Sequence, residues 1–133
     1  MKKGGVLNPT LAAMIANCQH GDKIMICDSG YPIPYDKDSL DLSVTVNLPR
    51  VIDVAKVVLD DLNIEGVIIT NEMEVRSRGF YDELMKILPK VPVQKISHAD
   101  FKELAKKEQN IVFVRTGEAT SFANLILVSG VIF

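Results

Sequence analysis

Gly66-Val67-Ile68-Ile69-Thr70 is the stretch that decides the fold class of this chain. The run is short and rich in β-branched residues, and it lacks the apolar–polar alternation of a strand with one face in water. A continuous apolar run of this kind is typical of a parallel strand that is covered on both faces. The rest of the sequence therefore has to supply further strands, and helices for two faces of a sheet.

Similar apolar runs recur along the chain, and segments with helical spacing separate them. Further strands are predicted at 24–27, 91–96, 111–114 and 125–128, and residues 42–46 alternate like a short strand. Helices are predicted to begin at Pro9, Pro49, Phe80 and Ser97. Because strands and helices alternate, the sequence predicts an α/β fold in a single domain over residues 1–133. Its central sheet is mainly parallel, with helices on both faces.

The composition excludes several classes of partner. Fifteen basic residues against 17 acidic ones give a net charge of −2, which supplies no basic surface for nucleic acid. No apolar run approaches the length of a membrane span, and the apolar part of the basic N-terminus is too short for a signal peptide. Cys18 and Cys27 form no C-x-x-C pair, so the sequence predicts free thiols in a cytoplasmic protein and no metal site.

Two groups that can hold or move protons bracket the strand predicted over 24–27. His20, one of only two histidines, precedes this strand, and Asp28 follows it. Ligands of open α/β sheets bind beyond the carboxyl ends of strands, where Asp28 would lie. At about 3.3 Å per residue, however, the two side chains would be on the order of 20 Å apart. If both serve one site, His20 therefore comes from a neighbouring protomer, and a fully active isolated monomer would contradict this hypothesis.

Position alone leaves simpler interpretations open for the polar residues. His20 also fits a histidine at a helix C-terminus, Asp28 fits a turn residue, and His98 fits a surface position in the first turn of the helix capped by Ser97. Glu72 and Glu74 lie close to two arginines, which indicates surface ion pairs. The turn at 116–118 lacks the glycine spacing and the lysine of a P-loop, so nucleotide binding is poorly supported.

Short motifs then follow one another along the whole chain. They are Met1-Lys2-Lys3-Gly4, Val6-Leu7-Asn8, His20, Cys27-Asp28-Ser29-Gly30, Pro32-Ile33-Pro34, Thr70-Asn71-Glu72, Ser97-His98-Ala99-Asp100-Phe101, Arg115-Thr116-Gly117-Glu118, Phe122-Ala123-Asn124 and Gly130-Val131-Ile132-Phe133. Through these motifs, taken in this order, the chain resembles the D-ribose pyranase family, whose close relatives are the L-fucose mutarotases. The resemblance implies an isomerase that interconverts β-D-ribopyranose and β-D-ribofuranose without metal or organic cofactor. Such an enzyme supplies the furanose for ribose phosphorylation.

The resemblance also implies roles for individual residues. His20 is the expected catalytic acid, and the expected sugar contacts come from Asp28, His98, Phe122, Ala123 and Asn124. The fucose relatives have arginine in place of His98, which favours ribose as the substrate. The family has tyrosine where this chain has Phe122, so a hydroxyl is missing here. The family forms ring-like homo-oligomers, which implies a homodecamer with active sites at subunit interfaces.

The chemistry of ring exchange matches these residue types. Ring opening removes the proton of the anomeric hydroxyl and protonates the ring oxygen, and closure through another hydroxyl gives the other ring size. A histidine with a carboxylate and an amide suffices for this. Two alternatives stay open: a mutarotase of another free sugar such as fucose, and a sugar-binding regulatory protein without turnover. The missing hydroxyl at Phe122 keeps the second alternative open.

Overall fold

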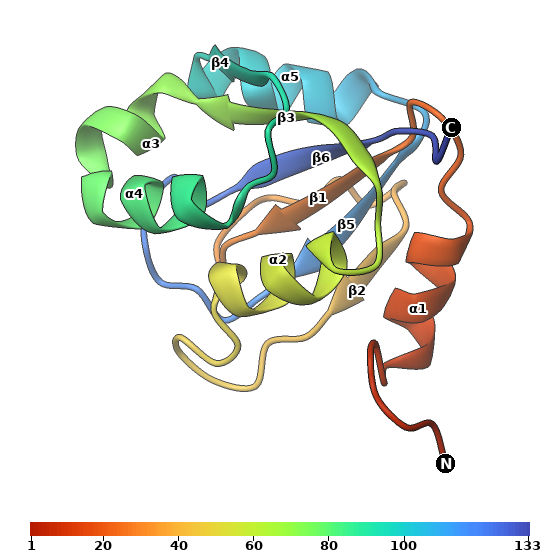
Figure 1. Cartoon of the computed structure of the whole chain (residues 1–133). Coiled ribbons are helices and arrows are strands. Elements are labelled where there is room, and N and C mark those ends of the chain that lie inside the picture. Colours follow the sequence, from red (N-terminus) through yellow and green to blue (C-terminus); the bar gives the residue numbers. More distant parts are fainter.

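A six-stranded sheet with the strand order β2-β5-β1-β6-β3-β4 forms the centre of the molecule (Figure 1). The computed structural model describes residues 1–133. The strands are β1 (Lys23–Cys27), β2 (Ser39–Asp41), β3 (Ile64–Thr70), β4 (Val93–Ile96), β5 (Ile111–Arg115) and β6 (Leu125–Ser129). The helices are α1 (Pro9–Ala16), α2 (Val51–Leu59), α3 (Asn71–Arg76), α4 (Arg78–Ile87) and α5 (His98–Lys107). The chain is thus a single α/β domain, as the sequence predicts.

Helices cover both faces of the sheet, which confirms the predicted architecture. Residues of α1 to α4 pack against one face, and α2 and α4 lie in front of the sheet in Figure 1. The other face packs against α5, which lies behind the sheet, and against Tyr31. In β1, Ile24 and Ile26 belong to the first cluster, whereas Met25 and Cys27 belong to the second. All four side chains are fully buried, which explains why the run has no polar alternation.

One strand runs against the others. β1 pairs in parallel with β5, β5 with β2, and β3 with β4, whereas β6 is antiparallel to both β1 and β3. The sheet is therefore mainly parallel, as predicted, with β6 reversed in its middle. We name two edges of the sheet after the two ends of its strands, not after the outermost strands. The carboxyl edge is the side of the sheet on which the five parallel strands end, and the amino edge is the opposite side, on which they begin. Because β6 is reversed, it begins at the carboxyl edge and ends at the amino edge.

Two local features differ from the prediction. The short strand expected at 42–46 is found instead as β2 at Ser39–Asp41, and the chain that follows it turns at Asn47, whose φ is +59°. The backbone at residues 47–49 binds the turn after β5: Asn47 N–H donates to Gly117 O (2.6 Å), and Gly117 N–H donates to Pro49 O (2.9 Å). The helix α3 is not predicted, because only Met73 of its six residues is buried and no apolar period develops.

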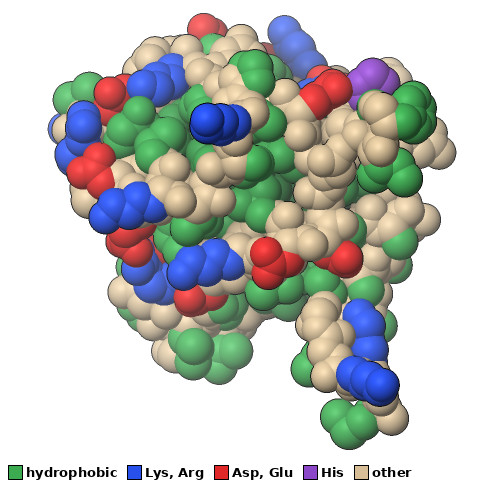
Figure 2. Space-filling view, in the orientation of Figure 1, with side chains coloured by type: hydrophobic (Ala, Val, Ile, Leu, Met, Phe, Trp, Pro, Cys, Tyr) green, Lys and Arg blue, Asp and Glu red, His purple; other side chains and the backbone are tan.

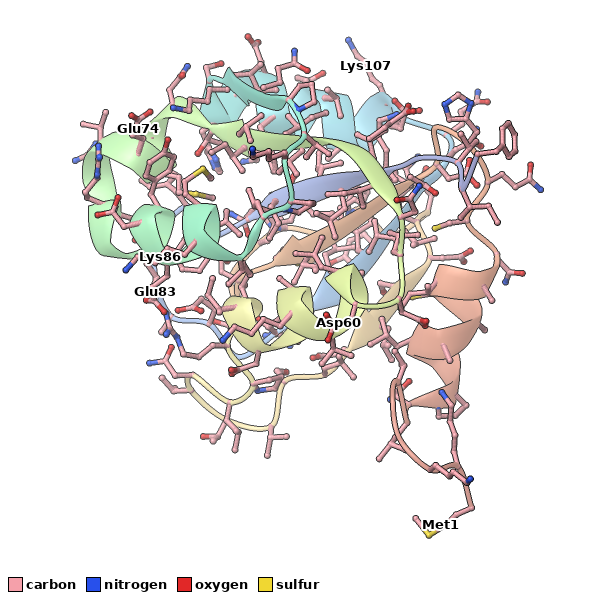
Figure 3. All side chains as sticks on the ribbon, in the orientation of Figure 1. Met1, Asp60, Glu74, Glu83, Lys86 and Lys107 are labelled. Carbon is pink, nitrogen blue, oxygen red and sulfur yellow. The ribbon has the colours of Figure 1, made fainter.

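The surface carries mixed charge. Figure 2 shows lysine and arginine side chains interleaved with acidic ones on the visible face, without one large basic field. None of the helices has both the length and the apolar composition that crossing a membrane would require. Figure 3 shows Glu83 on α4 beside the start of α2, where Arg50 donates to its carboxylate (3.1 Å).

Candidate functional site

The carboxyl edge brings together the residues that the sequence singles out for sugar contacts. Asp28 follows β1, His98 begins α5 after β4, and the segment 122–124 leads into β6. The Asp28 N–H donates to Asn124 Oδ1 (2.8 Å), and the rings of His98 and Phe122 meet edge to face with centroids 5.1 Å apart. Three elements that are distant in sequence thus converge at one place.

The Asp28 carboxyl group is half-buried and held in place. Its Oδ1 accepts a hydrogen bond from Gly30 N–H (3.0 Å), as in the turn that the sequence suggests. Burial raises the pKa of the Asp28 carboxyl, and hydrogen bonds from the Gly30 backbone and the Asn124 side chain partly oppose this shift. Asn124 itself is buried, so it forms a fixed support for Asp28. This geometry provides a preorganised acceptor for hydroxyl groups.

His98 is positioned through its backbone. Both carboxylate oxygens of Glu72 accept from the His98 N–H (2.9 and 3.2 Å), and the Ser97 hydroxyl caps the helix by accepting from Asp100 N–H (3.1 Å). The expectation that Glu72 forms a surface ion pair is therefore wrong. For Glu74 it is confirmed, because Arg78 Nη1 lies 3.7 Å from its carboxylate, to which Lys95 also donates (2.6 Å).

The ring of His98 has an unusual feature. Its Nδ1 is the only buried side-chain nitrogen or oxygen atom of the chain without a hydrogen-bond partner. Buried polar atoms are normally paired, so this one calls for an explanation. Because this atom is shielded from solvent, a ligand hydroxyl at the carboxyl edge could supply the missing partner only after the His98 ring turns.

The segment from Phe122 to Asn124 has a constrained backbone. Phe122 has a φ of +59°, in the left-handed region that bulky side chains rarely adopt. Such a conformation costs of order 1–3 kcal/mol and is concentrated at functional sites. The next two residues in the chain, Ala123 and Asn124, are buried. Phe122, the residue with the strained backbone, is therefore also the residue whose ring contacts His98.

His20 lies at the other end of the sheet. It follows α1 at the amino edge, where its Nε2 lies 2.8 Å from Glu65 Oε2 and its side chain is 62% exposed. The full length of β1 separates it from Asp28, as the strand length predicts. Within one subunit, the structure therefore does not bring His20 together with Asp28, His98 and the segment 122–124.

The turn at 116–118 has a structural role. The Glu118 side chain is 1% exposed, and it accepts from Val51 N–H at the start of α2 (3.0 Å) and from the Thr120 hydroxyl (2.8 Å). The Thr116 hydroxyl donates to Cys27 O (2.8 Å). The turn thus joins the ends of β1 and β5 to α2. No three His, Cys, Asp or Glu side chains form a group that could hold a metal ion.

Two contacts were not predictable from sequence spacing. Glu72 and His98 are 26 residues apart, and Glu65 and His20 are 45 residues apart. Glu72 does fall within one of the motifs that carry the family resemblance, which is the one signal that could have drawn attention to it. Nothing in the sequence singles out Glu65.

Comparison with known proteins gives consistent matches over the whole chain. The model of the RbsD / FucU transport protein family matches residues 1–132. The D-ribose pyranases of Petrotoga mobilis and Coprothermobacter proteolyticus are 44% and 42% identical over 133 residues, covering 100% of each chain. The structure of Bacillus subtilis RbsD complexed with D-ribose matches with a TM-score of 0.93 at 37% identity, covering 100% of both chains. The fucose mutarotase from Streptococcus pneumoniae in complex with L-fucose, at 21% identity, shares the fold, with a TM-score of 0.75 over 96% of this chain and 95% of that one.

Proposed function

Because this chain belongs to the RbsD / FucU family, we infer that it is an isomerase that interconverts the ring forms of D-ribose. The full-length identity to D-ribose pyranases and the likeness to a ribose-bound RbsD support this activity. The unpaired Nδ1 of His98, beside Asp28 and Phe122, is the structural observation that carries the choice of site. The exchange is between β-D-ribopyranose and β-D-ribofuranose, and the furanose then serves ribose phosphorylation.

The residues at the carboxyl edge form the proposed sugar-binding half of the site. The Asp28 carboxylate accepts hydrogen bonds from sugar hydroxyls; Gly30 N–H holds the carboxylate, and Asn124 Oδ1 holds the Asp28 backbone. The His98 ring turns its buried Nδ1 toward the sugar and pairs with a further hydroxyl, and the Phe122 ring forms an apolar wall. The backbone of Phe122, Ala123 and Asn124 completes the contacts, and it does not need the hydroxyl that a tyrosine would add.

The proposed chemistry is general acid–base catalysis by His20. A base takes the proton of the anomeric hydroxyl, the bond from the anomeric carbon to the ring oxygen breaks, and the imidazolium of His20 gives its proton to that oxygen. In the open aldehyde, the C4 hydroxyl then attacks in place of the C5 hydroxyl, and the proton transfers run in reverse. General acid–base help of this kind is worth about 10²–10⁴-fold, which suits a reaction that also proceeds unaided.

We place His20 of one subunit against the sugar-binding half of a neighbouring subunit. His20 is exposed at the amino edge and is too far from Asp28 to share a site within one chain. The family resemblance implies a homodecamer, in which such shared sites form at the interfaces. We further propose the cytoplasm as its location, because both cysteines are free thiols.

Saturation-transfer NMR on ribose tests this function directly. We expect the protein to accelerate exchange between the pyranose and furanose signals of ribose, and to act less on fucose. Faster exchange of fucose would instead identify a fucose mutarotase. Binding of ribose without accelerated exchange would identify a regulatory sugar-binding protein and overturn the proposed activity.

Mixed assemblies test the shared site. We expect His20→Ala and Asp28→Asn proteins each to be nearly inactive, because each lacks one half of every site. Co-expressed, they should regain activity at roughly a quarter of their sites, where a native His20 meets a native Asp28. Exchange rates of the purified mixture, compared with each variant alone, provide the measurement. A mixture no faster than its two components would show that the site lies within one subunit.

A further inference from the structure

We propose that Glu65 is a positioning residue that fixes the orientation and the tautomer of His20. The inference rests on the proposed function, in which His20 carries the proton. It starts from the contact between His20 Nε2 and Glu65 Oε2, which are 2.8 Å apart with side chains that are 62% and 46% exposed. Exposed ion pairs are common and mostly weak, so the contact alone says little. The surrounding backbone shows that this one is built into the fold.

Glu65 lies at an irregularity of β3. Ile64 pairs with Ser129 and Gly66 pairs with Val128, so the register shifts at Glu65 and leaves it without a partner on β6. Bulges of this kind re-aim a side chain and are frequent beside active sites. Gly130 allows the strand to pass close by, since a Cβ there would lie 3.3 Å from the backbone N and the Cβ of Glu65. The bulge therefore gives the Glu65 side chain its direction toward His20.

The turn that contains His20 is hydrogen-bonded to Ser129, at the end of β6 that also pairs with the bulged part of β3. Gly21 has a φ of +85°, and its N–H donates to Ser129 O (2.8 Å). The Ser129 N–H in turn donates to Asp22 O (2.8 Å), and the Asp22 carboxylate accepts from Gln19 N–H (2.8 Å). Ser129 thus pairs with the turn on one side and with the bulged strand on the other. The positions of His20 and Glu65 relative to each other are set by backbone hydrogen bonds.

A carboxylate partner determines which ring nitrogen can react. A neutral imidazole has one N–H donor and one acceptor, and an ionised carboxylate only accepts. The Nε2 facing Glu65 therefore carries the hydrogen, and Nδ1 carries the lone pair. After protonation Nδ1–H becomes the donor, so Nδ1 is the atom that exchanges protons with the sugar. Glu65 itself touches no sugar, and its role is that of the carboxylates that orient histidines in other sites.

The protein suits a direct measurement of the tautomer, because it has only two histidines. In ¹⁵N-histidine-labelled protein at alkaline pH, without substrate, we expect the His20 signals to show hydrogen on Nε2. Free histidine also favours this tautomer, so in Glu65→Ala the fraction with hydrogen on Nε2 should fall to that of free histidine, while the His98 signals stay unchanged. Ribose exchange in Glu65→Ala should fall about 10- to 100-fold. The ribose concentration for half-saturation should stay the same, since Glu65 does not contact the sugar.

Two further variants control for folding and for the loss of a surface charge. Glu65→Gln keeps the shape, but its amide both donates and accepts, so we expect mixed His20 tautomers and slowed exchange. Glu103→Gln removes a carboxylate from another exposed pair, with Lys107, and should change neither readout. Hydrogen on Nδ1 of His20 in the native protein, or native exchange in Glu65→Ala where His20→Ala is slow, would overturn the proposal. Native exchange in His20→Ala would instead overturn the proposed role of His20 as the catalytic acid, and the tautomer spectra are independent of that result.

Discussion

Replacing His20 by alanine should slow the exchange of ribose ring forms by about 10²–10⁴-fold, because the proton donor to the ring oxygen is lost. Ribose binding should remain measurable, since the proposed sugar contacts lie at the carboxyl edge and come from another subunit. Saturation-transfer NMR gives the exchange rate, and calorimetric titration with ribose gives the affinity. Of all single substitutions, this one is expected to have the largest effect on activity.

The stability of the variant serves as its control. The His20–Glu65 pair is largely exposed, so its loss should change the free energy of unfolding by less than about 1 kcal/mol. His98→Ala provides the contrast, because it removes a proposed sugar contact and should raise the half-saturating ribose concentration. An exchange rate in His20→Ala equal to that of the native protein would refute its assignment as the catalytic acid.

Gly117→Ala should have the largest effect on stability among changes of a single methyl group. The added Cβ would overlap Thr45 O and lie 2.7 Å from Leu48 O and 2.9 Å from Leu48 N. All three are backbone atoms of a loop that is hydrogen-bonded to Gly117, so no side chain can rotate away. We expect a loss of about 3 kcal/mol or more in the free energy of unfolding, at the upper end for overpacking. The measurement is the midpoint of chemical denaturation.

The matched control is Gly79→Ala in α4. No atom lies within 4 Å of a Cβ at Gly79, and alanine favours the helix, so this variant should be as stable as the native protein or gain about 0.5–1 kcal/mol. If Gly117→Ala unfolds at the native midpoint, the close packing of the 45–48 loop on the turn at 116–118 is not a source of stability.

Local signals made much of the fold predictable from the sequence. Asn8 accepts from Leu11 N–H (2.9 Å) and Ser97 caps α5, as their positions before apolar periodic segments predict. The fully apolar runs became strands buried on both faces. The insertion of a reversed β6 between β1 and β3 was not predictable, because pairing partners and strand direction depend on contacts between distant segments.

The site was predictable only in part for the same reason. Asp28 and His98 stand at a strand end and a helix start, and both positions can be recognised locally. Glu72 and Glu65 contact histidines that are distant in sequence. The direction of the Glu65 side chain depends on a bulge in β3 that the sequence of the strand does not indicate. The roles assigned to His20, Asp28, His98 and the segment 122–124 all stay predictions, which the proposed experiments address.

The reversed direction of β6 makes strand length itself a constraint on how this protein can evolve. At one end of β1 and β6, Asn124 holds Asp28, and at the other end Ser129 holds Gly21. One inserted or deleted residue in either strand would turn every later side chain to the opposite face of the sheet. Both halves of the proposed site would then be lost together. Insertions and deletions among natural variants should therefore fall in the turn at 35–37, where the chain has no such register to keep.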